Sequence, residues 1–167
     1  MNTTLISIGL VLLIVSCSTK QQEDKDIDEA EEKSEIELES TVVHDPSEAI
    51  WLHDYNQQTG EFEIKQIRAV SHDTLSGEAI EKIINKTWPK VQIEFIRTSN
   101  DTTFIFIPDS EVLTQQMGTA GAKSFIISTT FSFTELKGIS YVSFDFEEGD
   151  HGIPGVYTRN SWDKKIK

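Results

Sequence analysis

The stretch Thr119–Leu136, TAGAKSFIISTTFSFTEL, decides the fold, because its pattern fits both a helix and a strand. Apolar and small residues spaced three or four apart would form one helical face, and Gly138 just beyond them would serve as a C-cap. The alternation from Phe125 to Thr134 fits a strand equally well, and its β-branched and aromatic residues favour that state. The residues alone therefore leave both interpretations open.

The segments before this stretch predict a strand pair and a helix. Residues 49–55 and 61–70 are expected strands on either side of a turn that contains Gly60. Ser76 is a suitable N-cap for a helix over 77–88, which carries one apolar stripe and is stopped by Pro89.

Further strands are expected on both sides of the ambiguous stretch. Residues 91–99 alternate apolar and polar side chains, and the apolar run 104–107 follows a short polar turn, so the two segments predict an antiparallel hairpin. Residues 139–146 predict a last strand with one apolar face, which runs into a turn at 147–150. Residues 41–167 contain no internal repeat or second linker, and they are enough for a single domain with its own core.

The amino terminus predicts a lipid anchor. The only cysteine, Cys17, ends the run Leu12–Cys17, LLIVSC, which resembles a bacterial lipobox. The apolar stretch Leu5–Val15 is shorter than the roughly 20 residues that a membrane span needs, so it predicts a signal peptide; the alternative is a short buried helix. We therefore expect a lipoprotein signal peptide over 1–16, lipidation of Cys17, and a place in the cell envelope at the outer membrane. The sequence does not decide whether the chain lies on the periplasmic or the surface face of the outer membrane.

An acidic segment follows the cysteine. Residues 20–39 carry ten carboxylates against three lysines and no aromatic residue, so residues 17–40 are expected to form a lipidated, disordered tether. Extended by its own charge, the tether would reach at most roughly 80 Å. It is either an export or interaction signal or a solvated spacer. The net charge of −13 makes nucleic acid an unsuitable partner.

The order of these elements resembles the GerMN domain, a sporulation and spore-germination module of bacterial envelope lipoproteins. The resemblance covers roughly residues 49–149, and residues 150–167 extend beyond it. Its motif-like segments are Ile67-Arg68-Ala69-Val70, the helix 77–88, Ile107-Pro108-Asp109-Ser110, the loop Met117-Gly118-Thr119-Ala120-Gly121-Ala122, Phe133-Thr134-Glu135-Leu136-Lys137-Gly138-Ile139, and Val142-Ser143-Phe144.

The resemblance implies an α+β fold, with a small mixed or antiparallel sheet of about four or five strands packed by two main helices. It also implies that residues 119–136 are helical, which resolves the ambiguity. The family has no known active-site constellation and is similar to ring-building modules of envelope machines. We therefore expect a non-enzymatic binding or assembly role through protein-protein contacts, with an envelope protein or further copies of the chain as partner, and no cofactor.

The alternative functions are a metal-binding or small-ligand domain, or a hydrolase that uses the turn 147–155. In that turn an Asp-His pair could tune a general base, and carboxylates with a histidine could bind a divalent metal. The other histidines, His44, His53 and His72, show no metal-ligand spacing to the turn. A Gly-rich, Pro-containing turn with solvated acidic side chains explains the segment better. The sequence also contains no nucleophile motif or phosphate-binding loop.

Six residues near the carboxyl end form the candidate binding surface: Glu147, Glu148, Asp150, His151, Arg159 and Trp162. Trp162 is either a clasp onto the domain or part of an exposed contact patch. A ligand groove is a further possibility, in which arginines orient an anionic group among aromatic side chains. The groove candidates are Trp51, Tyr55, Trp88, Tyr157 and Trp162 with Arg68, Arg97 and Arg159, although Trp88 fits a core position better.

Overall fold

The computed structural model describes residues 44–162. The predicted signal peptide 1–16, Cys17 with the tether 17–40, and the final residues 163–167 lie outside the described residues. The elements in chain order are η1 (Pro46–Glu48), β1 (Trp51–Asn56), β2 (Glu61–Gln66), α2 (Gly77–Thr87), β3 (Glu94–Ser99), β4 (Thr102–Phe106), the π-helical turn η2 (Val112–Gln116), α3 (Gly118–Phe133), β5 (Tyr141–Asp145), β6 (Gly155–Tyr157) and η3 (Arg159–Trp162).

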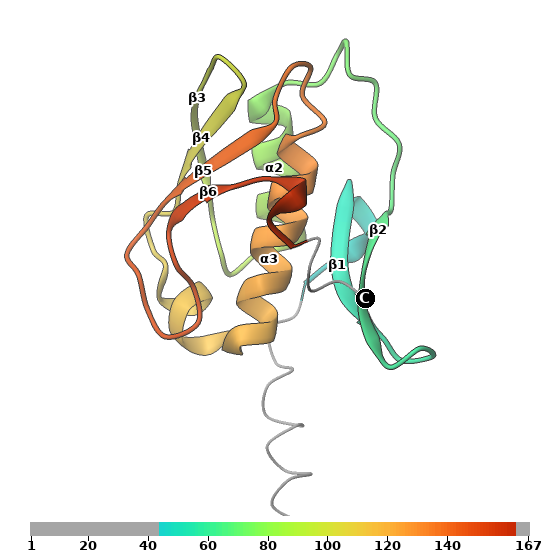
Figure 1. Ribbon diagram of the computed structural model, residues 1–167, viewed down its shortest axis with the longest axis vertical. Coiled ribbons are helices and arrows are strands. Elements are labelled where there is room, and N and C mark those ends of the chain that lie inside the picture. The colour runs from blue at the N-terminus through green and yellow to red at the C-terminus, as the bar shows by residue number, and fades with distance from the viewer. Residues whose placement is uncertain (1–43, 163–167) are drawn as a thin grey trace, which may run out of the picture.

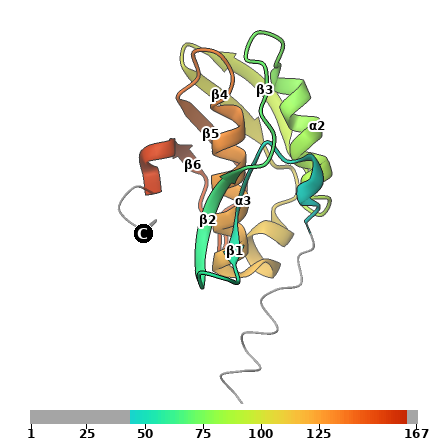
Figure 2. The ribbon, with the colours of Figure 1, turned by 90° about the vertical axis from the view of Figure 1, so that its right-hand side faces the viewer.

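Two sheets lie on either side of α3. A four-stranded sheet of order β3-β4-β5-β6 lies on one side of this helix, and the two-stranded hairpin β1-β2 lies on the other (Figure 1). Helix α2 packs beside α3 on the same face of the larger sheet (Figure 2). The fold is therefore α+β with two main helices, as the resemblance implies.

The larger sheet is mixed. Strands β4 and β5 pair in parallel, whereas β3-β4 and β5-β6 are antiparallel. A parallel pair needs a crossover connection, and the chain supplies it through η2 and α3. The crossover places α3 against the sheet, where Phe144 and Val142 of β5 are buried.

The predicted segments are present with small changes in their bounds. The strand pair is β1 and β2, the second hairpin is β3 and β4, and the last predicted strand is β5. Helix α2 begins after Ser76, whose hydroxyl accepts a hydrogen bond from the amide of Ala79. The short strand β6 begins at Gly155, where the predicted turn 147–155 ends, and the sequence predicts no strand there.

The stretch that decides the fold is helical from Gly118 to Phe133. From Ser124 onward its serines and threonines are buried along with its apolar side chains, because the sheet, the hairpin and α2 together enclose the helix. The hydroxyl of Ser128 accepts the backbone N–H of His53, and the hydroxyl of Ser132 donates to the carbonyl of Ser128. These bonds satisfy polar groups that burial would otherwise leave unpaired.

Side chains from the helices close two strand edges. Ser128 of α3 occupies the free edge of β1. At the start of β3, Glu81 accepts the amide of Phe95, and Asn85 both donates to and accepts from the backbone of Ile93. A β-bulge between Phe95 and Arg97 then interrupts the rest of that edge. Both strands are thereby protected from pairing with another chain.

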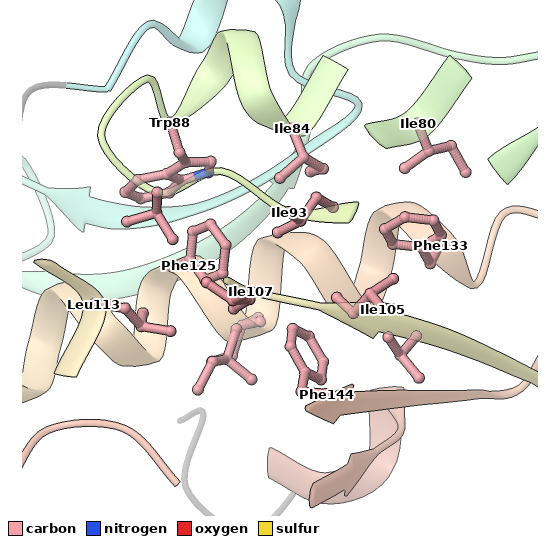
Figure 3. Packing of buried hydrophobic residues seen from close by; sticks show 14 of the residues in the cluster. Ile80, Ile84, Trp88, Ile93, Ile105, Ile107, Leu113, Phe125, Phe133 and Phe144 are labelled. Carbon is pink, nitrogen blue, oxygen red and sulfur yellow. The ribbon is translucent and has the colours of Figure 1, made fainter. Parts of the chain in front are cut away.

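The main core lies between the larger sheet and the two helices. Figure 3 shows Ile80, Ile84 and Trp88 from α2 and its end facing Phe125 of α3, with Ile105 of β4 beyond them. Trp88 is only 2% exposed, which confirms that it belongs to the core rather than to a ligand groove. None of the helices within residues 44–162 has both the length and the apolar content that crossing a bilayer requires.

Candidate functional site

The structure separates the six residues of the predicted binding surface into different places. Glu147 and Glu148 line a polar cavity of about 370 Å³ between η2 and the turn that follows β5. Asp109 and Glu111 supply two more carboxylates on its other side, and Ser110 anchors the turn through a hydrogen bond to the carbonyl of Glu147. The cavity is acidic, yet among the described residues no three His, Cys, Asp or Glu side chains are placed to hold a metal ion.

Asp150 and His151 continue the same turn. The amide of His151 donates to the carbonyl of Thr114, and its ring Nδ1 lies 3.2 Å from the hydroxyl of Thr119. This ring nitrogen therefore contacts a hydroxyl of α3 rather than a carboxylate. Asp150 is exposed to solvent. The arrangement fastens the turn to the start of α3 and does not form the Asp-His pair that a general base would need.

Arg159 lies at another place, in a cluster around the buried carboxylate of Glu135. Its Nη2 donates to Glu135 and to the carbonyl of Phe131, and its Nε donates to the hydroxyl of Thr134 at 2.7 Å. The guanidinium carbon lies 5.1 Å from the ring centroid of Trp51 and 4.9 Å from that of Phe131. The cluster joins β1, the end of α3 and η3.

The electrostatics of this cluster favour a charged Glu135. Burial by itself raises the pKa of Glu135, but hydrogen bonds from Arg159 and from the indole N–H of Trp51 outweigh it, so the pKa lies below its usual value. Beside the cluster is an open cavity of about 530 Å³, which Arg159 lines together with Thr134, Tyr141 and Asn160. The guanidinium nevertheless directs its bonds inward, to Glu135 and α3, which makes it a structural tie.

Trp162 packs onto the domain. Its side chain is 9% exposed, and its ring stacks on Tyr157 with an interplanar angle of 4°. Of the two alternatives for Trp162, the clasp is the one observed, and its assignment to an exposed binding surface is wrong because Tyr157 and Phe131 cover it.

The predicted ligand groove is also divided. Trp51, Tyr157 and Trp162 gather around Phe131, whereas Tyr55 pairs with Phe62 on the hairpin. The arginines are equally dispersed, because Arg68 lies near Glu48, Arg97 lies over Phe104, and Arg159 lies in the Glu135 cluster. The aromatic and basic side chains therefore do not line one site.

Sequence reasoning missed a different surface, the outer side of the four-stranded sheet. Alternation along the strands directs Ile105, Val142 and Phe144 into the core, so Phe104 and Ser143 point to the opposite side. The register aligns Arg97, Phe104, Ser143 and Val156 across all four strands. Helices α2 and α3 cover only the inner side of the sheet (Figure 1).

We define the open sheet face as Arg97, Phe104, Phe106, Tyr141, Ser143 and Val156. Val156 is 59% exposed and Tyr141 is 40% exposed, while Phe104 and Phe106 are half-buried. The guanidinium of Arg97 lies 4.2 Å above the ring of Phe104. The strand alternation around Phe104 and Phe106 could have indicated this face, but it could not show that no helix covers it.

Comparison of the chain with protein-family models, with curated proteins and with solved structures found no match.

Proposed function

We propose that the chain is a lipid-anchored protein of the cell envelope, held at the outer membrane, that docks a protein partner without catalysing a reaction. The open sheet face is the observation that supports this role best. It presents aromatic and aliphatic side chains to solvent on a regularly paired sheet. Aromatic residues and arginine are the side chains most enriched in protein interfaces.

The composition of the open sheet face suits a protein partner. Phe104, Phe106 and Tyr141 supply rigid apolar area, and Arg97 covers Phe104 with a charge that remains accessible. The charged side chains of Glu94 and Asp145 stand on the same side of the sheet, in register with Phe106. An apolar centre with charged neighbours is the usual arrangement of a specific, reversible interface.

The proposed anchor places this surface near the membrane. Lipidation of Cys17 would hold the chain on the bilayer through its acyl chains, and the acidic tether would let the domain reach a partner up to roughly 80 Å away. The likeness of the element order to the GerMN domain favours the same kind of assembly role. The role therefore combines fixed localisation with a mobile docking domain.

Crosslinked capture from native membranes tests the proposal. The full chain is compared with a Val156→Lys, Tyr141→Lys double variant, which adds two charges to the open sheet face. The Tyr55→Lys, Gln57→Lys double variant, which also adds two charges, serves as the matched control, because both side chains are exposed on the hairpin, on the other side of α3. We expect one reproducible protein partner with the wild type and the control, and at least a tenfold loss with the Val156→Lys, Tyr141→Lys variant.

Thermal unfolding of each variant confirms that the fold is retained before capture is interpreted. Equal capture by the Val156→Lys, Tyr141→Lys variant and the control would contradict docking on this face. If no protein is captured from native membranes and the purified chain converts a substrate, the non-enzymatic role is contradicted.

A further inference from the structure

The outer edge of β2 carries backbone groups without a partner among the described residues. The amide of His53 points away from β2 to Ser128, so His53 and Ile64 face each other without exchanging hydrogen bonds. In an antiparallel pair such positions alternate with bonded ones. The N–H and C=O groups of Phe62, Ile64 and Gln66 therefore point outward, and no group within residues 44–162 bonds to them.

Within residues 44–162, β2 is the long strand whose outer edge stays open. The edges of β1 and β3 are occupied by side chains of α3 and α2, and β6 has only three residues. Figure 1 shows β1 between α3 and β2, so the open edge faces away from the helix. Phe62 and Ile67, on or next to β2, are 40% and 43% exposed. An edge of this kind is a template for pairing with another strand.

The sequence of β2 is complementary to itself when two copies run antiparallel about Ile64. This register places Glu63 of each copy opposite Lys65 of the other, and Phe62 opposite Gln66. In the same register Phe62, Ile64 and Gln66, whose backbone groups point outward, lie opposite one another. Each of their free N–H and C=O groups can therefore form a hydrogen bond with the second copy. A register centred on Glu63 or Lys65 would oppose positions whose backbone groups are already bonded to β1, and one centred on Phe62 would oppose Glu61 to Glu63.

The charges that would meet are present at neutral pH. Hydrogen bonds, of which the one from Asn56 has the largest effect, lower the pKa of Glu63 to about 2, so this carboxylate is ionised. Lys65 lies on the same face of the strand, with its Nζ 3.0 Å from Glu63. Its side chain is 56% exposed and can reach a second carboxylate across the edge. Two copies would thus form an alternating group of four charges.

We propose that the chain forms a twofold dimer in which β2 pairs with β2 of a second copy, giving a continuous four-stranded sheet of order β1-β2-β2-β1. The surface involved is distinct from the open sheet face, so this dimer and the proposed docking function can fail independently.

Charge exchange tests the dimer in the full chain purified in detergent. Sedimentation velocity across a dilution series measures self-association of the wild type, of Glu63→Lys and of Lys65→Glu. Each single variant opposes like charges twice across the twofold axis, so we expect roughly tenfold weaker dimerisation. An equimolar mixture of the two variants restores both opposite-charge pairs and should recover the wild-type affinity. Lys90→Glu, the same charge change at an exposed position after α2, should have no effect.

A backbone variant gives a second, independent measurement. Gln66→Pro removes an outward N–H without removing a hydrogen bond between β1 and β2, so each dimer loses two bonds by symmetry. We expect roughly tenfold weaker association or more. Amide exchange at Phe62, Ile64 and Gln66 in the wild type should slow as concentration rises.

Several results would overturn the proposal. The wild type could remain monomeric throughout the dilution series, or the dimer could persist unchanged in Glu63→Lys, Lys65→Glu and Gln66→Pro. Exchange protection of the three amides that does not depend on concentration would also overturn it, because another part of the same chain would then occupy the edge. If a charge variant fails to fold, Gln66→Pro and the exchange measurement still decide.

Discussion

Replacing Arg159 with methionine measures how strongly the Glu135 cluster holds the carboxyl-terminal segment to the domain. Methionine keeps much of the aliphatic length of the side chain and removes the guanidinium. The variant loses the hydrogen bonds to Thr134, Phe131 and Glu135. The Glu135 carboxylate, whose side chain is 8% exposed, is left without the guanidinium, and of its ionisable partners only the His72 ring remains, with Nδ1 3.5 Å from Oε2.

The magnitude follows from these contacts. Removing one partner of a fully buried ion pair costs about 3–5 kcal/mol, because the other charge stays buried. The Arg159 side chain is 37% exposed, so solvent screens part of the interaction. Trp51 continues to donate its indole N–H to Glu135 at 2.8 Å. We expect the free energy of unfolding to fall by about 2–3 kcal/mol at pH 7.

The loss should depend on pH with a definite sign. In the wild type the pKa of Glu135 is lowered on folding, so the ion pair stabilises the domain above the unfolded pKa of about 4.3 and loses its effect as the pH falls through the folded pKa. Without Arg159, only the indole N–H of Trp51 and the His72 ring still oppose the effect of burial, so we expect the folded pKa of Glu135 to rise. The variant can then take up a proton on Glu135, so its deficit relative to the wild type should shrink between neutral pH and about pH 4.

Urea unfolding at several pH values measures both the loss of unfolding free energy and its dependence on pH, since urea does not screen charges. Glu135→Gln and the combination of Glu135→Gln with Arg159→Met complete a double-mutant cycle. The double variant should lose less unfolding free energy than the sum of the losses in the two single variants. A deficit below about 0.5 kcal/mol at pH 7, or one that stays constant from pH 7 to pH 4, would refute the role assigned to the ion pair.

Three further outcomes are expected. Burial lowers the pKa of His53 to about 4, below its unfolded value of about 6.5, so the wild type should lose stability as the pH falls through this window, and His53→Gln should flatten the loss in urea titrations. Gly77→Ala would place a Cβ 2.3 Å from the ring of Phe95, so we expect about 1–3 kcal/mol of destabilisation by thermal unfolding, relieved when Phe95→Ala is added. Cys17→Ala should move the chain out of the detergent phase, and mass spectrometry of the mature wild type should show a lipidated Cys17; an intact Met1 would contradict the anchor.

The elements with one-sided burial could be predicted from the sequence. Helix α2 has its apolar residues on one face and a serine N-cap, and β5 alternates buried and exposed residues, so local pattern and environment agree. Helix α3 differs because three neighbours enclose it. From Ser124 onward its hydroxyl side chains are buried together with its apolar ones, so burial is not confined to one face. The residues fit a helix and a strand alike, and only the resemblance decided between them.

The candidate site was harder to predict from the sequence, because it depends on contacts between residues that are distant in the chain. Nothing in the local sequence links Arg159 to Glu135 or Trp51, and no spacing rule applies to a pair that tertiary packing creates. The strand β6 lies in a segment rich in glycine and proline, so its pairing with β5 is set by the sheet rather than by propensity. The open sheet face required knowledge of which side the helices cover.

The occupied edges of β1 and β3 limit how far this chain can polymerise. A molecule with open strands at two edges can add copies at both and grow into a fibre. Here Glu81 and Asn85 of α2 block the start of β3, and Ser128 of α3 blocks β1, so within the described residues β2 is the long edge that can accept a neighbour. Pairing about a twofold axis consumes that edge on both copies. Assembly through strand edges would therefore terminate at two molecules, which would be useful if the proposed anchor concentrates the chain on a membrane surface.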